Sequence, residues 1–249
     1  MHRNQYWLNP KVESAEELET QTKDICDIYR AARQITQRGI KLYSTDECTG
    51  IQAKERLHAD EPLREGRVKR VEYEYIRHGT LSLTANFEII SGRLESPTIG
   101  ETRTEADFAR HIAKTVEKDA EAAGWWFIVD QLNTHKSESL VKLVAQSEGI
   151  AERELGEKGK SGILRSMKSR QEFLENEQHQ IRFIYTPKHC SWLNQIEIWF
   201  SILSKKLIKW GNFKSKDDLK DQMEKFIEYF NQTMAKPFKW TFKGFPLRV

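Results

Sequence analysis

The architecture rests on the stretch Trp125-Trp126-Phe127-Ile128-Val129-Asp130-Gln131-Leu132-Asn133-Thr134-His135-Lys136. Gly124 precedes it, and five apolar residues then run directly into the carboxylate of Asp130. A short apolar run bounded by a turn residue is typical of a buried strand. Ligands of open α/β folds bind beyond the carboxyl ends of the strands, so Asp130 is a candidate site residue. The alternative is that Asp130 caps the next helix or simply ends the strand.

Apolar periodicity on both sides of this strand predicts the remaining elements. Helices are predicted over 14–36, 104–123, 137–148, 192–209 and from Ser215 onward. Strands are predicted over 40–47, 71–76, 81–90 and 181–185. The strands 71–76 and 81–90 are expected to form an antiparallel hairpin that turns at His78-Gly79-Thr80. Residues 50–68 are predicted to be a loop, as is the stretch that holds Gly92 and Pro97.

The segment 149–179 is charged and carries four glycines, which predicts a surface insertion with short helices. The predicted order is strand, hairpin, helix, strand, helix, insertion, strand, helix, helix. This order indicates an α/β fold in which an RNase H-like mixed sheet is flanked by helices. The charged insertion then precedes the last strand.

The composition describes a chain large enough for one sizeable domain. Of its 249 residues 38% are hydrophobic and 31% charged, and the net charge is only +3, so affinity for nucleic acid must come from local clusters. No apolar run is long enough to span a bilayer, and the polar residues 1–12 do not resemble a signal peptide. The cysteines Cys26, Cys48 and Cys190 lack metal-ligand spacing and suit a reducing compartment. We therefore expect a cytoplasmic protein without a membrane partner.

Three acids stand at comparable positions in the predicted fold. Asp46 follows the first strand, Asp130 follows the later strand, and Glu197 lies at the rim of the apolar face of the helix after the last strand. Phosphodiester hydrolysis needs an activated water and a stabilised leaving oxygen, and two divalent cations provide both. Carboxylates suit the hard cations Mg²⁺ and Mn²⁺, and three of them together would repel one another without metal. The set therefore predicts a site for two Mg²⁺ or Mn²⁺ ions, although each acid alone is also compatible with an ordinary surface charge.

Basic residues near these acids predict a polyanionic substrate. Some lie on the polar side of the Glu197 helix and others flank the proposed site, while the tail interleaves cations with aromatic residues, which suits phosphate contact and base stacking. The alternative for the helix is an ordinary solvated lysine face. The candidates for DNA contact are Asn194, Lys136, Lys188, His189, Lys205, Lys206, Lys209 and Lys239.

Three stretches, 44–53, 129–136 and 186–200, resemble the DDE transposases of the IS630 group in the IS630–Tc1–mariner superfamily. The most specific is 186–200, in which a proline-containing turn leads to Leu193-Asn194-Gln195-Ile196-Glu197 on an amphipathic helix. The similarity extends over roughly 38–249. It implies that Asp46, Asp130 and Glu197 form a catalytic, metal-binding triad. It also implies metal-dependent cleavage at transposon ends, followed by attack of the freed 3′-hydroxyl on target DNA.

The resemblance further implies double-stranded DNA as the partner, in the form of transposon terminal inverted repeats and target DNA, a homodimer as the working unit, and a bacterial or archaeal cell with the protein on the nucleoid. We expect 38–249 to be the catalytic domain, with 149–179 inserted between the second and third acids. We expect 1–37 to be a basic arm and an amphipathic helix, the remnant of a linker behind a missing helix-turn-helix region. Two alternatives remain open, a plain RNase H-type nuclease and a catalytically silent, truncated DNA-binding remnant.

Overall fold

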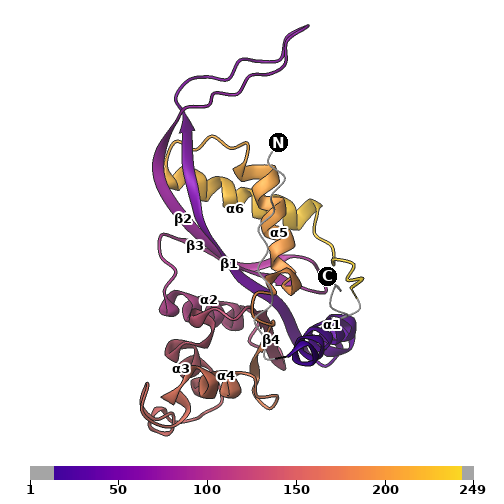
Figure 1. The fold of residues 1–249 in the computed structure, drawn as a ribbon, viewed down its shortest axis with the longest axis vertical. Helices are drawn as coiled ribbons and strands as arrows, with labels where there is room; N and C mark the ends of the chain where they lie inside the picture. The colour runs from indigo at the N-terminus through magenta and orange to yellow at the C-terminus, as the bar shows by residue number, and fades with distance from the viewer. Residues whose placement is uncertain (1–13, 243–249) are drawn as a thin grey trace.

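The computed structural model describes residues 14–242, and its centre is a mixed sheet of five strands in the order β3-β2-β1-β4-β5 (Figure 1). β1 pairs in parallel with β4 and β4 with β5, whereas β2 runs antiparallel to both β1 and β3. This is the RNase H-like arrangement that the order of elements predicts. The strands are β1 Ile40–Arg56, β2 Tyr75–Glu88, β3 Leu94–Gly100, β4 Gly124–Val129 and β5 Ile181–Tyr185.

Helices cover both faces of the sheet, and each face has its own hydrophobic cluster (Figure 1). Side chains alternate along β4, so that Ile128 lies in the cluster under α1, α5 and α6, whereas Phe127 lies in the cluster under α2, α3 and α4. Both residues are fully buried, which explains why the strand reads as an unbroken apolar run. The helices are α1 Ala15–Gln37, α2 Glu105–Lys118, α3 Glu138–Ser147, α4 Met167–Leu174, α5 Ile196–Leu203 and α6 Lys216–Thr233.

Side-chain caps set the starts of the long helices where the sequence predicts them. Ser14, Ser137 and Ser215 each accept a hydrogen bond from a backbone N–H of the first turn of α1, α3 or α6. Thr104 and Asp107 form a reciprocal capping box at the start of α2. The predicted basic arm over 1–12 lies outside the described residues. None of the helices within 14–242 combines the length and the hydrophobicity needed to cross a membrane.

The predicted hairpin of 71–76 with 81–90 is wrong, and so is the start of the predicted loop 50–68. β1 continues to Arg56 and is itself the hairpin partner of β2, with the connection at 57–74. The supposed turn at Gly79 lies inside β2, at a register shift opposite 52–54, where glycine accommodates a φ of +110°. A glycine inside an alternating pattern marked a bulge here rather than a turn.

β3 was not predicted, because Gly92 and Pro97 indicate a loop. Pro97 is compatible with β3 because this strand lies at the edge of the sheet, beside a register shift between Thr84 and Asn86 of β2. Ser96, with a φ of +49°, lies at the same irregularity. Edge position and bulge together remove the need for the backbone N–H that proline lacks.

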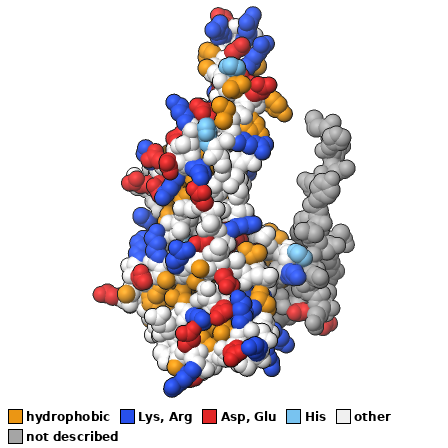
Figure 2. Space-filling view, turned by 90° about the vertical axis from the view of Figure 1, so that its left-hand side faces the viewer, with side chains coloured by type: hydrophobic (Ala, Val, Ile, Leu, Met, Phe, Trp, Pro, Cys, Tyr) orange, Lys and Arg blue, Asp and Glu red, His pale blue; other side chains and the backbone are white. Residues whose placement is uncertain are grey.

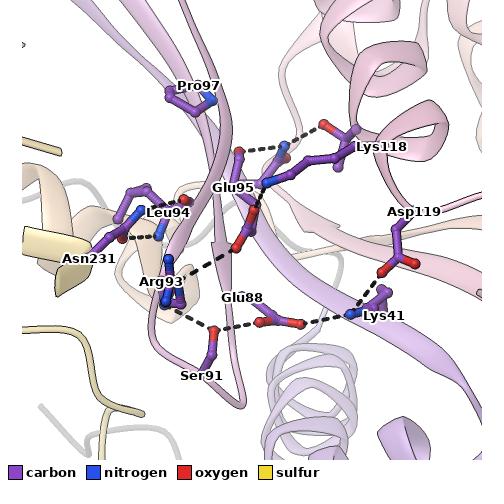
Figure 3. A network of polar contacts seen from close by, with 12 residues as sticks. Lys41, Glu88, Ser91, Arg93, Leu94, Glu95, Pro97, Lys118, Asp119 and Asn231 are labelled. Carbon is purple, nitrogen blue, oxygen red and sulfur yellow. Dashed lines mark hydrogen bonds and ion pairs between the residues drawn. The ribbon is translucent and has the colours of Figure 1, made fainter. Parts of the chain in front are cut away.

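Polar contacts hold this edge strand in place (Figure 3). The Asn231 side chain of α6 both donates to the carbonyl and accepts from the N–H of Leu94, each at 2.8 Å. Glu95 pairs with Lys118 of α2 on the other side. Lys41 joins Asp119 at 2.8 Å and Glu88 at 3.6 Å, which ties β1 to the end of α2. These contacts use up hydrogen-bonding groups that a free edge would offer to another chain.

The connection 57–74 projects from the sheet as a narrow arm (Figure 1), and Figure 2 shows that its surface mixes apolar, basic and acidic side chains. Two isolated bridges, Glu61 with Arg70 and Arg64 with Arg67, keep its two legs paired. Among its exposed apolar side chains Tyr73 is 91% exposed.

Two further elements differ from the prediction. The segment 149–179 is not only a surface insertion, because Leu155, Leu164 and Leu174 are buried in the cluster under α2, α3 and α4. The predicted helix 192–209 is three pieces, since a 3₁₀ turn over Ser191–Leu193 precedes α5 and a π-helix over Ser204–Ile208 continues it. A π-turn of this kind shifts the apolar stripe by one residue, which periodicity does not detect.

Candidate active site

Asp46 and Asp130 lie side by side because β1 and β4 are neighbouring parallel strands. The register places Ser44 opposite Ile128, and the same register two residues further along brings Asp46 level with Asp130. Both are on the face that carries Ile128, which is the face covered by α5. Ligand atoms of Asp46, Asp130 and His135 all lie within 4.8 Å of one another. The sheet therefore brings two of the three predicted acids together.

Glu197 lies on α5 and is not part of the cluster that Asp46, Asp130 and His135 form. It stands in the first turn of that helix, where the helix dipole favours a negative charge. Burial raises the pKa of Glu197, and the charge of Asp130 raises it further. Burial also raises the pKa of the Cys48 thiol to about 11, with further contributions from the charges of Glu197 and Asp46. Of the three predicted acids, Asp46 and Asp130 therefore belong to the cluster with His135, and the charge of Asp130 also acts on Glu197.

His135 contacts two of the acidic residues of the site, and it was not among the predicted site residues. It is fully buried and lies in the 3₁₀ turn Asn133–Lys136, directly after the strand that ends before Asp130. Its Nδ1 lies 2.9 Å from Asp130 Oδ1 and its Nε2 lies 2.9 Å from Glu47 Oε2. The Glu47 side chain is only 4% exposed. The imidazole thus links the end of β4 to the opposite face of β1.

Burial, hydrogen bonds and neighbouring charges together shift the pKa values of His135, Asp130 and Asp46. Burial alone would lower the pKa of His135, but its hydrogen bonds to Asp130 and Glu47 raise that pKa to about 10, so the ring is an imidazolium at neutral pH. Burial would raise the pKa of Asp130, but the hydrogen bond and the charge of His135 hold it below its ordinary value. Asp46 has no hydrogen bond to His135, and burial together with the charge of Asp130 raises its pKa to about 8, although the charge of His135 opposes this shift.

Asn194 does not face solvent, which differs from its predicted role as a DNA contact. It is fully buried, its Nδ2 donates to the carbonyl of Thr45 at 3.0 Å and to Asp46 Oδ2 at 3.4 Å, and its Oδ1 accepts from Ser44. Ser44 Oγ in turn accepts from the N–H of Ile196 at 2.8 Å. Asn194 therefore joins the start of α5 to β1 and sets the position of the helix relative to Asp46.

The donor set fits a hard divalent cation. Asp46 and Asp130 offer carboxylate oxygens, which Mg²⁺ and Mn²⁺ prefer. His135 belongs to the same cluster, but both of its nitrogens are engaged with carboxylates, so it orients a ligand rather than serving as one. The raised pKa of Asp46 reports a buried carboxylate beside the like charge of Asp130, and the positive charge of a bound cation would favour its ionised form.

The raised pKa of Asp46 predicts a pH effect on stability. Between the ordinary pKa of 3.8 and about 8, folded Asp46 keeps a proton that the unfolded chain has lost. This contribution to the stability of the metal-free protein is therefore present at the acidic end and is lost as pH rises through about 8. We expect the melting temperature of chelator-treated wild type to fall relative to Asp46→Asn between about pH 4 and about pH 8, and the difference to stay constant above that. Asp24→Asn, an exposed carboxylate on α1, is the control, and equal pH profiles for Asp46→Asn and wild type would contradict the assignment.

The predicted basic residues divide into two groups. Lys188 and His189 are exposed beside Asp130, and Lys205, Lys206 and Lys209 are exposed at the end of the helix that begins with α5. Lys136 is buried instead, with its ammonium bonded to Gln131 and Gln171 and placed 4.9 Å from the ring centre of Tyr185. Its place in the fold is structural, since burial also lowers its pKa.

The aromatic residues of the tail pack on the protein rather than stand free for stacking on bases. Phe238 stacks on Phe87 at 4.5 Å between ring centres, and Trp240 packs against Tyr29 at 4.7 Å. Lys239 between them is exposed. The tail beyond 242 lies outside the described residues.

Two functional residues, His135 and Glu47, escaped the sequence analysis, and a signal existed for one of them. His135 follows Asp130 by five residues, within the stretch 125–136. This spacing puts His135 in the turn that leaves the strand. Glu47 points to the other face of β1 from Asp46, because successive strand residues alternate. Its role depends on His135 folding back over the sheet, which no pattern along β1 reports.

Comparisons with known proteins agree with this geometry. A family model described as DDE superfamily endonuclease matches residues 41–220. No curated protein matches the chain in sequence.

Solved structures of Mos1 share the fold. The Mos1 mariner paired end complex with Mn is 12% identical at a TM-score of 0.53, over 92% of this chain and 59% of that one. The paired end complex with Mg is 11% identical at a TM-score of 0.51, over 96% of this chain and 68% of that one. A paired-end complex with left transposon end is 12% identical at a TM-score of 0.50, again over 92% and 59%. The chain thus spans about 59% of the length of two of these transposase chains, and the shared property is the RNase H-like fold.

Proposed function

Because the chain belongs to the DDE superfamily endonucleases, we propose that it cuts phosphodiester bonds at transposon ends and joins the freed 3′-hydroxyl to target DNA. The observation that supports this proposal is the closeness of Asp46 and Asp130, which belong to one cluster of ligand atoms within 4.8 Å; Glu197 stands in the first turn of α5, and the charge of Asp130 raises its pKa. We assign the catalytic, metal-binding triad to these three residues. In this proposal the chain is an IS630-type member of the superfamily.

The triad would hold two Mg²⁺ or Mn²⁺ ions. Bound in this way, such ions activate the attacking oxygen and stabilise the leaving one. Asp130 stays ionised and fixed in direction by His135, while Asp46 gives up its proton when a cation is bound. Glu197 completes the set from the helix side and takes its place from the Asn194 link to β1. Two structures of the same fold are Mos1 mariner paired end complexes with Mn and with Mg.

The proposed partner is double-stranded DNA, with a homodimer holding two transposon ends and the target. Exposed lysines suit phosphate contact: Lys188 lines the same hollow as Asp130, and Lys205, Lys206 and Lys209 follow α5. His189 is exposed beside Lys188. The Mos1 structures of the same fold are paired-end complexes. The reaction would take place on the nucleoid of a bacterial or archaeal cell.

We further propose that 38–249 is the catalytic domain and that 1–37 belongs to a linker region toward an end-recognition module. Within the described part of the linker, α1 is built into the catalytic domain. Its Ile25, Ala32 and Ile35 share a cluster with Ile128, and the Tyr29 hydroxyl donates to the carbonyl of Leu193 at 2.8 Å. Movement of α1 would therefore be transmitted to the turn before Glu197.

Calorimetric titration of Mn²⁺ into the purified chain tests the triad without knowledge of the DNA ends. We expect binding to weaken by at least about tenfold in each of Asp46→Asn, Asp130→Asn and Glu197→Gln, because each removes an anionic ligand. The exposed Asp217→Asn is the matched control. Weakening at a single position would contradict a shared site, and absence of binding calls for the same titration with duplex DNA present.

A joining assay separates the transposase from the two alternatives. With a DNA duplex that already carries a free 3′-hydroxyl end, a transposase produces a joined strand in a target plasmid, whereas an RNase H-type nuclease produces only cuts. A silent remnant binds DNA and does neither. The alternatives are tested with wild type beside Glu197→Gln, so that contaminating nucleases appear equally in both.

A further inference from the structure

A hollow of about 460 Å³ opens beside the proposed triad, and nothing so far assigns it an occupant. Asp130 lies at one end of it, and the segment between β5 and α5 forms the rest of its wall. We call it the Trp192 hollow, lined among others by Asp130, Thr186, Lys188, His189, Cys190 and Trp192. Its volume lies in the range of small-molecule sites, roughly 300–1,000 Å³.

Thr186 belongs to this wall, and its hydroxyl is buried behind the surface of the hollow. The residue is fully buried, and among the described residues its Oγ1 has no hydrogen-bond partner. Its carbonyl is used, since it accepts from Gln131 Nε2 at 2.9 Å. A buried hydroxyl left unpaired costs stability.

Trp192 supplies a flat apolar surface at the rim. Its side chain is 44% exposed, and it is held from one side by Phe242, edge to face at 5.1 Å and 81°. The tail therefore fixes the indole in position while part of it stays open to solvent. An aromatic ring held ready in this way is the usual platform for a nucleobase.

The same lining carries an exposed lysine next to a strained backbone. Lys188 and His189 are exposed, and His189 has a φ of +64°, a conformation that non-glycine residues adopt at some cost. Lys188 is positioned to meet a phosphate near Asp130. Cys190 below them is buried, and burial raises the pKa of its thiol, so the floor is an unreactive wall.

We infer that the Trp192 hollow holds one unstacked nucleobase of the nucleotide next to the phosphate that the triad attacks. The inference rests on the proposed function, because Asp130 joins the two sites. The base would stack on Trp192, while its phosphate lies against Lys188. A duplex cannot enter a hollow of this size, so the nucleotide enters frayed or already single-stranded.

The test compares DNA binding by Trp192→Ala with that by wild type, on a duplex with a single-stranded 3′ tail of thymidines and on the same duplex with a tail of abasic residues. Binding is read by fluorescence anisotropy with chelator present, so that no cleavage is needed. We expect wild type to prefer the thymidine tail by about tenfold, the usual effect of one stacked base, and Trp192→Ala to lose this preference. Trp192→Phe retains most of it, and Trp210→Ala, an exposed tryptophan after the π-helix, behaves as wild type.

A second readout locates the base directly. A 5-iodouracil in the first tail position is expected to cross-link to Trp192 on irradiation, and the cross-linked peptide is identified by mass spectrometry. Equal affinity of wild type for the two tails, or equal losses on both tails in Trp192→Ala, would overturn the inference. Failure of the proposed endonuclease function is seen separately, as wild type that binds the thymidine tail but never cuts DNA with Mn²⁺.

Discussion

Glu197→Gln is expected to reduce metal-dependent DNA cleavage by about a thousandfold or more while leaving the fold intact. Metal-bound transition states gain several kcal/mol from such a site, and each 1.36 kcal/mol corresponds to a factor of ten in rate. The amide keeps the shape of the carboxylate, so the side chain can still occupy its half-buried position in the first turn of α5. The rate of nicking of a supercoiled plasmid in Mn²⁺ measures the effect.

The same substitution is expected to leave the stability of the metal-free protein unchanged or raised. Burial and the charge of Asp130 both disfavour the ionised form of Glu197, and glutamine removes that repulsion. Loss of activity with retained or higher melting temperature is the pattern of a residue kept for function rather than for folding. The exposed Glu224→Gln on α6 is the matched control. A Glu197→Gln protein that cuts at the wild-type rate would remove Glu197 from the triad.

His135→Ala is expected to destabilise the protein by about 3–5 kcal/mol, because it leaves the carboxylates of Asp130 and Glu47 buried without their shared cation. For a chain of this size the melting temperature then falls by roughly 10 °C. The matched control is His78→Ala, since His78 pairs with Glu55 at 2.8 Å with both side chains nearly 30% exposed. That exposed pair is expected to contribute less than about 1 kcal/mol.

Two further measurements separate the charge effect from lost packing. Glu47→Gln removes one of the two buried carboxylates that His135→Ala leaves without a partner. The double variant should therefore lose less stability than the sum of the losses in the two single variants. The pKa of His135 is raised from 6.5 to about 10, so its contribution is complete below about 6.5 and fades as pH rises through about 10. The difference in free energy of unfolding between wild type and His135→Ala should therefore shrink as pH rises from about 6.5 to about 10. If the stability losses of the two single variants add up in the double variant, and the stability difference between wild type and His135→Ala does not change with pH, His135 acts by packing alone.

The two faces of β1 have divided tasks at the site. Asp46 points toward α5 and keeps its proton up to about pH 8, because burial and the charge of Asp130 raise its pKa, whereas Glu47 points the other way and pairs with His135. One strand therefore carries both the residue that binds and the residue that holds its neighbour in place. This division explains the difference between the two aspartates: the hydrogen bond from His135 lowers the pKa of Asp130, whereas Asp46 lacks that bond.

The sequence by itself determined the elements whose signals are local. β4 and β5 read as apolar runs, the serine and threonine caps marked the helix starts, and the acids at the ends of these elements indicated the site. These features survive because propensity, burial and capping depend on residues a few positions apart. The mixed sheet then follows, since short connections leave few ways to arrange such elements.

Only the tertiary structure decided which partner each strand takes and which polar side chains are buried. β1 extends to Arg56 because β2 pairs with it along that length, and Pro97 is tolerated because β3 is an edge. Asn194 and Lys136 look like surface residues in the sequence, yet both are buried because other elements fold over them. The Glu47–His135–Asp130 link joins positions 88 residues apart. Whether a residue is buried, and which strand it pairs with, depends on the segments that pack against it. The sequence around the residue does not specify those segments.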